Sequence, residues 1–214
     1  IITSLIGMGQ PNLLMFEPTY ADELEVILRY TFSYMQNREG SSVYIRLSTR
    51  NIPQIKREIN KSLEEKILSG GYWLEKPKNK SNITIVFSGV IAPEVLEAAR
   101  LIKEDDVNVS ILIITSSDRL YKNWKLSQKE RSKGIKMISR IDELFSDTLD
   151  DSAIVSVIDA HSSSLTWIGG AVGKKIVSLG VDEFGQSGNL KDLYHNYSID
   201  ADAIIDACAQ VLSN

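Results

Sequence analysis

The segment Asp159-Ala160-His161 places a carboxylate and an imidazole directly after an apolar run, Ala153 to Ile158, and before three serines. In open α/β sheets, ligands bind in the crevice at the carboxyl ends of the strands, so Asp159 and His161 could contact a ligand or a partner subunit there. The alternative is that Asp159 and the serines cap the helix that follows.

A second segment, Asp182 to Gly188, contains two glycines and follows another short apolar run. It is typical of a turn that enters a helix capped by Ser187 or Asn189. We expect Gly185 to occupy a tight turn in which a side chain would clash or require an unfavourable φ.

Other motifs that carry chemistry are absent from the sequence or incomplete. Gly7-Met8-Gly9 lacks the third glycine and the preceding strand of a dinucleotide-binding fingerprint, and no P-loop occurs. His161 and His195 are the only histidines, too few for a histidine-rich metal site. Cys208 lies on the apolar side of a predicted helix and is interpreted as a core residue rather than a nucleophile.

The elements that must position these residues alternate along the chain. Four apolar runs predict strands covered on both faces, and helical periodicity between them predicts an α/β fold with a small, mostly parallel sheet flanked by helices. A helix-strand-helix unit precedes this sheet and ends at Gly70-Gly71, which divides the chain into 1–70 and 71–214. The predicted strands are 43–47, 83–87, 109–114, 153–158 and 176–179, and predicted helices include 19–36, 55–68 and 201–212.

Composition excludes several classes of protein. The 214 residues carry a net charge of −4 and contain one cysteine. No window approaches the roughly 18 apolar residues of a membrane span, and a single cysteine excludes a disulfide scaffold. An acidic chain is not expected to bind nucleic acid, although residues 119–140 contain eight bases, one acid and Trp124. We interpret this stretch as a solvated helical connection neutralised by the five acids of residues 142–151.

The sequence begins with Ile1 and has no secretory signal. We therefore expect a piece of a longer chain located in the cytoplasm and not bound to a membrane.

The order of several motifs resembles the end of the transketolase family of thiamine diphosphate enzymes. Val177 to Gly188 is similar to the family's Gly-x-Asp-x-Phe-Gly-x-Ser turn, and Ile199 to Ala203 is similar to the start of its last helix. Phe16 to Leu24 resembles a helix entry in the family's pyrimidine-binding domain. The resemblance implies that 1–70 is the tail of that domain and that 71–214 is the family's C-terminal domain.

Within the family, Glu17 to Leu24 and Gly71 to Glu75 resemble the homodimeric pyruvate dehydrogenase decarboxylases. Leu47 to Gln54 is closer to transketolase proper, in which an arginine of this segment binds the sugar phosphate. Aligned on Asn51-Ile52-Pro53-Gln54, that arginine falls on Thr49, and Arg50 is displaced by one residue. Because a one-residue offset at a strand end turns a side chain to the other face, we expect Arg50 to miss the phosphate-binding pose. Thr49, Arg50, Asp159 and His161 are the candidate substrate-binding residues.

The resemblance also implies cofactors and partners. Family members bind thiamine diphosphate through Mg²⁺ on a Gly-Asp-Gly…Asn motif, which this sequence lacks, and the activating glutamate would precede Ile1. We therefore expect no catalytic, cofactor or metal residue in this chain, and expect it to be inactive alone. The implied partners are a second subunit of a homodimer and a lipoyl acyltransferase. The alternatives are the C-terminal part of a transketolase or a stand-alone α/β interaction module.

Overall fold

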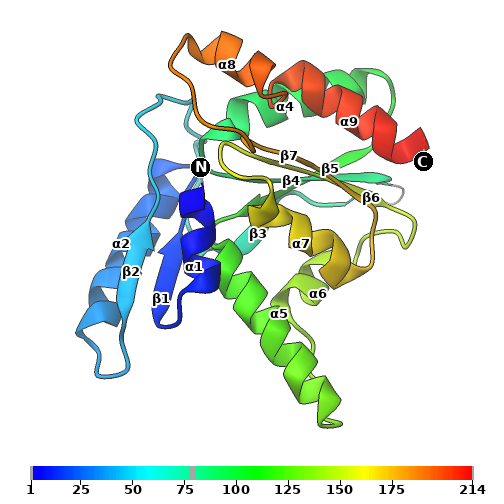
Figure 1. Cartoon of the computed structure of the whole chain (residues 1–214). Coiled ribbons are helices and arrows are strands. Elements are labelled where there is room, and N and C mark those ends of the chain that lie inside the picture. The colour runs from blue at the N-terminus through cyan, green and yellow to red at the C-terminus, as the bar shows by residue number, and fades with distance from the viewer. Residues whose placement is uncertain (1, 78–80, 214) are drawn as a thin grey trace.

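The computed structural model describes residues 2–77 and 81–213. The chain forms two sheets flanked by helices (Figure 1). A two-stranded sheet contains β1 and β2, and a five-stranded sheet has the order β3-β5-β4-β6-β7. The strands are β1 (Leu13–Phe16), β2 (Ser42–Ile45), β3 (Gly71–Glu75), β4 (Ile83–Ser88), β5 (Val109–Ile114), β6 (Ala153–Ile158) and β7 (Ile176–Leu179).

The helices occupy both faces of the larger sheet. In Figure 1, α4 and α9 cover one face, while α5, α6 and α7 lie on the other. The α-helices are α1 (Ile6–Gly9), α2 (Ala21–Gln36), α3 (Lys61–Leu68), α4 (Ala92–Glu104), α5 (Ser117–Ser132), α6 (Arg140–Phe145), α7 (Ser163–Val172), α8 (Leu190–Asn196) and α9 (Ala201–Ser213). Two short 3₁₀ helices, η1 (Ile2–Leu5) and η2 (Gly89–Ile91), complete the fold.

The larger sheet confirms the predicted α/β class. Its four central and edge strands β5, β4, β6 and β7 are parallel, and β4, β5 and β6 are buried along their whole length. Because side chains alternate across a strand, neighbouring residues of these strands point to opposite faces of the sheet and pack into two separate cores. Ile85 and Ile111 pack under α4 and α9, whereas Val86 and Leu112 pack against the α6 and α7 side.

Two strands were absent from the expected set. Gly71–Glu75 forms β3, which pairs antiparallel with β5 at the sheet edge. Leu13–Phe16 forms β1, which pairs in parallel with β2. Both are short, and β1 has only four residues, too few for a periodic pattern to be distinguished in the sequence.

Two of the predicted boundaries, the end of the strand before residue 48 and the start of the helix before Gly70, differ in the structure. The strand ends at Ile45, so Arg46 and Leu47 lie beyond it. The helix expected over 55–68 begins only at Lys61, where the Asn60 side chain caps the amide of Leu63 at 2.9 Å. The preceding residues have no helical hydrogen bonds because their side chains serve other contacts, such as the ion pair of Arg57 with Asp22. At the far end, Gly70 has φ +111°, a conformation that favours glycine.

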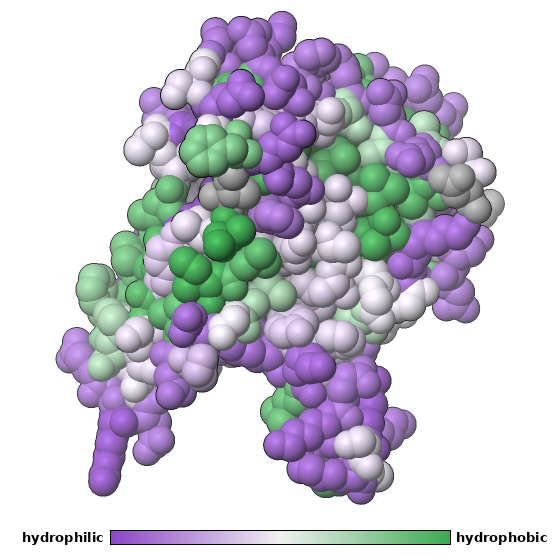
Figure 2. Space-filling model, viewed as in Figure 1, coloured by the Kyte–Doolittle hydropathy of each residue, from purple (hydrophilic) through white to green (hydrophobic). Residues whose placement is uncertain are grey.

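The basic stretch lies mostly on α5, which projects from the body of the molecule (Figure 1). Figure 2 shows this projection as a mostly hydrophilic surface. Arg131 forms an ion pair with Asp142 at 2.5 Å, and Arg140 forms one with Glu143 at 3.1 Å. These pairs agree with a solvated helical connection balanced by the following acids. No helix among residues 2–77 and 81–213 has the length and apolarity to cross a membrane.

Candidate functional site

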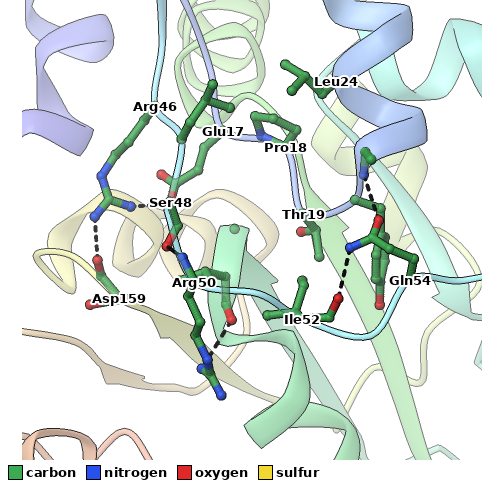
Figure 3. A pocket seen from close by; sticks show the side chains of 15 residues that line it. Glu17, Pro18, Thr19, Leu24, Arg46, Ser48, Arg50, Ile52, Gln54 and Asp159 are labelled. Carbon is green, nitrogen blue, oxygen red and sulfur yellow. Dashed lines mark hydrogen bonds and ion pairs between the residues drawn. The ribbon is translucent and has the colours of Figure 1, made fainter. Parts of the chain in front are cut away.

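A cavity of about 230 Å³ lies where the segment after β1 meets the carboxyl ends of β4 and β6 (Figure 3). Its walls therefore come from both parts of the chain, 1–70 and 71–213. This is the crevice position expected for ligands in an open α/β sheet. The lining includes Glu17, Pro18, Thr19, Tyr20, Leu24, Arg46, Ser48, Arg50, Ile52, Gln54, Gly89, Val90 and Asp159.

We call this hollow the seam cavity. Arg46 connects the two parts of the chain, 1–70 and 71–213, that form its walls. One guanidinium nitrogen, Nη1, forms an ion pair with the Glu17 carboxylate. The other, Nη2, donates to the backbone oxygen of Asp159 at 2.6 Å. Backbone hydrogen bonds also fix the positions of Arg46 and Glu17, because the Arg46 amide donates to the Phe16 carbonyl and the Glu17 amide donates to the Thr115 carbonyl. The two side chains therefore meet where hydrogen bonds hold the backbone at the strand ends.

Glu17 is almost completely buried, with 5% of its surface exposed. Burial raises its pKa from 4.5 to about 6, and the positive charge of Arg46 offsets part of that effect. At neutral pH the carboxylate is ionised and paired, which makes the cavity wall nearly neutral at this point.

The raised pKa of Glu17 predicts a pH effect on stability. The folded state keeps the Glu17 proton to a higher pH than the unfolded chain, so this contribution is fully present below pH 4.5 and is lost as the pH rises through about 6. The complete loss corresponds to about 2 kcal/mol. We expect the difference in free energy of unfolding between wild type and Glu17→Gln to change by this amount between about pH 3.5 and about pH 7. Denaturant titrations at several pH values measure it, and a constant difference would contradict the assignment.

Arg50 also lines the cavity. We expected the one-residue offset to keep Arg50 out of the pose that a phosphate clamp requires, and this stays a prediction. Its guanidinium is occupied, since Nη2 and Nη1 bind the two oxygens of Glu94 at 2.7 and 2.9 Å. The guanidinium also lies 5.2 Å from the centre of the Tyr194 ring. Because both terminal nitrogens of Arg50 bind the Glu94 carboxylate, the guanidinium has few N–H groups left to bind a phosphate.

Asp159 joins the cavity from the end of β6. Its backbone oxygen accepts from Arg46, and its carboxylate oxygen Oδ2 accepts from the Tyr194 hydroxyl at 2.9 Å. Burial and the nearby Asp159 charge raise the pKa of Tyr194, which keeps that hydroxyl protonated as a donor. The alternative role of Asp159 as a helix cap is therefore wrong, because its carboxylate is bound to α8 instead.

His161 lies outside the lining of the cavity. Its Nδ1 accepts from the Ser163 amide at 3.2 Å and lies 3.4 Å from Asp182 Oδ1. A nitrogen that accepts a hydrogen bond from an amide carries no proton of its own. The principal contact of His161 Nδ1 is therefore the hydrogen bond from the Ser163 amide, and not a salt bridge with Asp182. Asp182 instead binds the amide and hydroxyl of Ser162 at 2.8 and 2.7 Å. His161 and the turn after β7 therefore form a separate cluster.

The structure thus brings together two of the four predicted substrate-binding residues, Arg50 and Asp159. Thr49 is exposed and, like His161, is not part of the lining. Sequence reasoning missed Glu17 and Arg46 as site residues. Each is a charged residue directly after a short strand. This position could not be recognised in the sequence, because β1 was not expected and the strand expected over 43–47 included Arg46.

Glu23 supports the wall that contains Thr19 and Tyr20. Its buried carboxylate accepts from the amides of both residues at 2.7 and 3.3 Å, and also from the Tyr72 hydroxyl. Arg57 lies 3.3 Å from the same carboxylate. Burial raises the pKa of Glu23, whereas these hydrogen bonds and Arg57 lower it. Glu23 is thus a positioning residue for the segment that enters α2.

The described residues do not fit the metal-diphosphate part of a thiamine cofactor. Across residues 2–77 and 81–213, no three His, Cys, Asp or Glu side chains are arranged to hold a metal ion, and the sequence has no Gly-Asp-Gly.

Cys208 is 2% exposed, and burial raises its pKa to about 12. The prediction that it is a core residue is confirmed.

Comparison with known proteins decides the family. The model of the transketolase-like C-terminal domain matches residues 70–200, more than half of the chain. The chain belongs to the transketolase C-terminal domain family. This confirms the resemblance inferred from the Gly-x-Asp-x-Phe-Gly-x-Ser turn.

Curated relatives of this transketolase-family chain carry two names. The pyruvate dehydrogenase E1 components of Buchnera aphidicola and Escherichia coli K12 are 27% and 24% identical over 92% of the chain. The chloroplastic transketolase of Craterostigma plantagineum is 25% identical over 95% of it. The chain spans 22% of the length of the two E1 components and 35% of that transketolase.

Solved structures support the fold. A split-gene transketolase, described as an inactive β4 tetramer, superposes with a TM-score of 0.73 at 17% identity. It covers all of this chain, which in turn covers 62% of that protein. A transketolase from Pichia stipitis in complex with sedoheptulose 7-phosphate superposes with a TM-score of 0.70, also at 17% identity, and this chain covers 27% of it.

Proposed function

We propose that this chain is the C-terminal part of a thiamine diphosphate-dependent pyruvate dehydrogenase E1 component. The complete enzyme decarboxylates pyruvate and passes the acetyl group to a lipoyl carrier. Residues 1–70 are the tail of its pyrimidine-binding domain, and 71–214 are its C-terminal domain. The enzyme acts in the cytoplasm as a homodimer that docks a lipoyl acyltransferase.

The charge balance of the seam cavity supports this choice of substrate. Arg46 is paired with Glu17, and Arg50 with Glu94. A sugar phosphate carries close to two negative charges and is best held by a free, bidentate guanidinium. A small 2-oxo acid carries one charge and needs no such clamp. The names of the E1 relatives favour the same substrate.

A transketolase is the second candidate, because the structural neighbours carry that name and Arg50 lines the cavity. A rotation of Arg50 away from Glu94 would free its guanidinium for a phosphate. The coding sequence upstream of Ile1 is a first test of the enzyme proposal. A reading frame that encodes Gly-Asp-Gly…Asn supports an enzyme of this family, and its absence from the genome would favour a stand-alone interaction module.

The isolated chain is expected not to bind thiamine diphosphate in a Mg²⁺-dependent manner. The cofactor supplies the electron sink for decarboxylation, but the protein must hold its diphosphate through a metal. In our proposal, residues outside this chain do so. Calorimetric titration of the 214-residue chain with cofactor and Mg²⁺ is the measurement. A micromolar dissociation constant that disappears on chelation would contradict this expectation.

Arg50→Ala in the complete enzyme is expected to leave kcat/KM for pyruvate within about twofold. A phosphate clamp would behave differently, because losing it costs on the order of 2–4 kcal/mol in transition-state binding, about 30- to 800-fold. Steady-state kinetics on pyruvate and on a ketose phosphate measure both effects, with a thermal melt to check folding. Ketose-phosphate activity that collapses in the variant would identify a transketolase.

A further inference from the structure

The ion pair between Arg50 and Glu94 joins the two parts of the chain beside the seam cavity. Arg50 lines the cavity, whereas Glu94 lies outside the lining, in the first turn of α4. Figure 3 shows the Arg50 side chain extending from the segment after β2 towards the start of α4. The Arg50 side chain is 22% exposed and that of Glu94 is 17% exposed, so the pair is only partly shielded from water.

Three contacts keep the Arg50 guanidinium at this position. Its Nη1 and Nη2 atoms donate to the two carboxylate oxygens of Glu94, and Nη1 also lies 3.5 Å from the Val90 carbonyl oxygen. The guanidinium carbon lies 5.2 Å from the centre of the Tyr194 ring. Glu94 is favoured where it lies even without Arg50, because the N-terminal turn of a 13-residue helix stabilises a carboxylate.

Glu94 therefore competes with any anion in the cavity for the same N–H groups. Turning Arg50 into the cavity would break both hydrogen bonds and leave the Glu94 carboxylate, which is mostly buried, without its partner. An ion pair that loses one partner away from water leaves an uncompensated charge, which is far more costly than the loss of an exposed pair. An incoming phosphate must offset that cost before it gains the guanidinium.

The other charged groups at the cavity do not favour a phosphate. Arg46 is already paired with Glu17, and the carboxylate of Asp159 also lies at the wall. With Glu94 included, three carboxylates stand against the two guanidinium groups of Arg46 and Arg50. A phosphate group carries close to two negative charges at neutral pH, so this excess of carboxylates opposes it more than it opposes a singly charged 2-oxo acid.

We propose that Glu94 determines which class of substrate the seam cavity accepts. It is a positioning residue that acts through Arg50: it occupies the guanidinium and thereby excludes phosphorylated substrates, while a small 2-oxo acid is still accepted. This inference rests on the proposed function and adds that a residue of α4, outside the cavity lining, sets the choice. Glutamine at this position keeps the shape of the side chain but removes its charge and one acceptor oxygen, so it should make Arg50 available to a phosphate.

Calorimetric titration of the 214-residue chain with inorganic phosphate, without Mg²⁺ and at low ionic strength, tests this proposal. We expect Glu94→Gln to bind phosphate at least tenfold more tightly than the wild type. The double variant Glu94→Gln/Arg50→Gln should return to the wild-type affinity, because the gained site consists of the released guanidinium. A purely structural role of Glu94 would not produce a gain of binding that depends on Arg50.

Glu97→Gln is the matched control. Glu97 is a glutamate of the same helix and binds Arg100 through both carboxylate oxygens, at 3.0 and 2.8 Å, but neither residue lines the cavity. This variant should bind phosphate as the wild type does. Thermal melts identify variants that fail to fold, and Glu94→Ala, which also releases Arg50, replaces Glu94→Gln if that variant does not fold.

Three outcomes would overturn the proposal. The first is a folded Glu94 variant that binds phosphate no more tightly than the wild type. The second is a gain that persists in the double variant or appears equally in Glu97→Gln, since the phosphate would then bind elsewhere. The third is saturable binding by the wild type that Arg50→Gln abolishes, which would show that Glu94 does not occupy Arg50. The proposed function is tested by another measurement, the substrate preference of the complete wild-type enzyme, so the two failures are distinguishable.

Discussion

Replacing Glu23 with alanine is expected to lower the free energy of unfolding by about 3–5 kcal/mol at neutral pH. The buried carboxylate is the shared acceptor of the Thr19 amide, the Tyr20 amide and the Tyr72 hydroxyl. Truncation leaves these donors without a partner and removes the carboxyl oxygen that Arg57 contacts. Denaturant unfolding of the variant and of the wild type measures the loss.

Glu25 provides the matched control, because it is a glutamate on the same helix. Its side chain is 72% exposed, and its only ion pair within residues 2–77 and 81–213, with Arg29, spans 3.7 Å. Exposed pairs of this kind contribute little, so Glu25→Ala should change stability by less than about 0.5 kcal/mol. Equal effects at the two positions would show that the network around Glu23 does not stabilise the fold.

Gly89→Ala is expected to cost about 2–4 kcal/mol, because two separate penalties apply at this position. Gly89 has φ +70°, which disfavours a side chain. An added Cβ would also overlap the Glu17 carboxylate. That carboxylate is held by Arg46 and cannot move aside without breaking the ion pair. Calorimetric melting of the variant measures the cost.

Gly185→Ala is the control for this experiment and corrects an expectation of ours. We expected a strained turn at Gly185, but its backbone is outside the left-handed region, and an added Cβ would have nothing within 4 Å. We now expect no measurable change in melting temperature. If Gly89→Ala were equally harmless, Gly89 would not constrain Glu17 at the cavity.

The larger sheet could be predicted because three of its strands, β4, β5 and β6, are buried along their whole length. Such strands appear in the sequence as uninterrupted apolar runs, and the limits of β5, β6 and β7 agree with those expected. The edge strand β3 and the short strand β1 lack this signal. The helix expected over 55–68 was too long, because Arg57 is held by tertiary ion pairs that local periodicity does not reveal.

The candidate site was less predictable than the fold, since it is built from pairs of residues distant in sequence. Arg46 and Asp159 are 113 residues apart, and Arg50 and Glu94 are 44 apart. The order of elements indicated that strand ends would meet, and Asp159, at the end of β6, lines the cavity. It did not indicate that Glu94 would occupy the Arg50 guanidinium, because that depends on the position of α4 over the segment after β2.

Substrate preference of the complete enzyme tests the central proposal most directly. The complete enzyme that we propose is supplied with thiamine diphosphate and Mg²⁺, and is assayed for CO₂ release from pyruvate and for two-carbon transfer from a ketose phosphate. We predict a kcat/KM for pyruvate at least tenfold above that for the ketose phosphate. Efficient transfer from the ketose phosphate, with no release of CO₂ from pyruvate, would contradict this account.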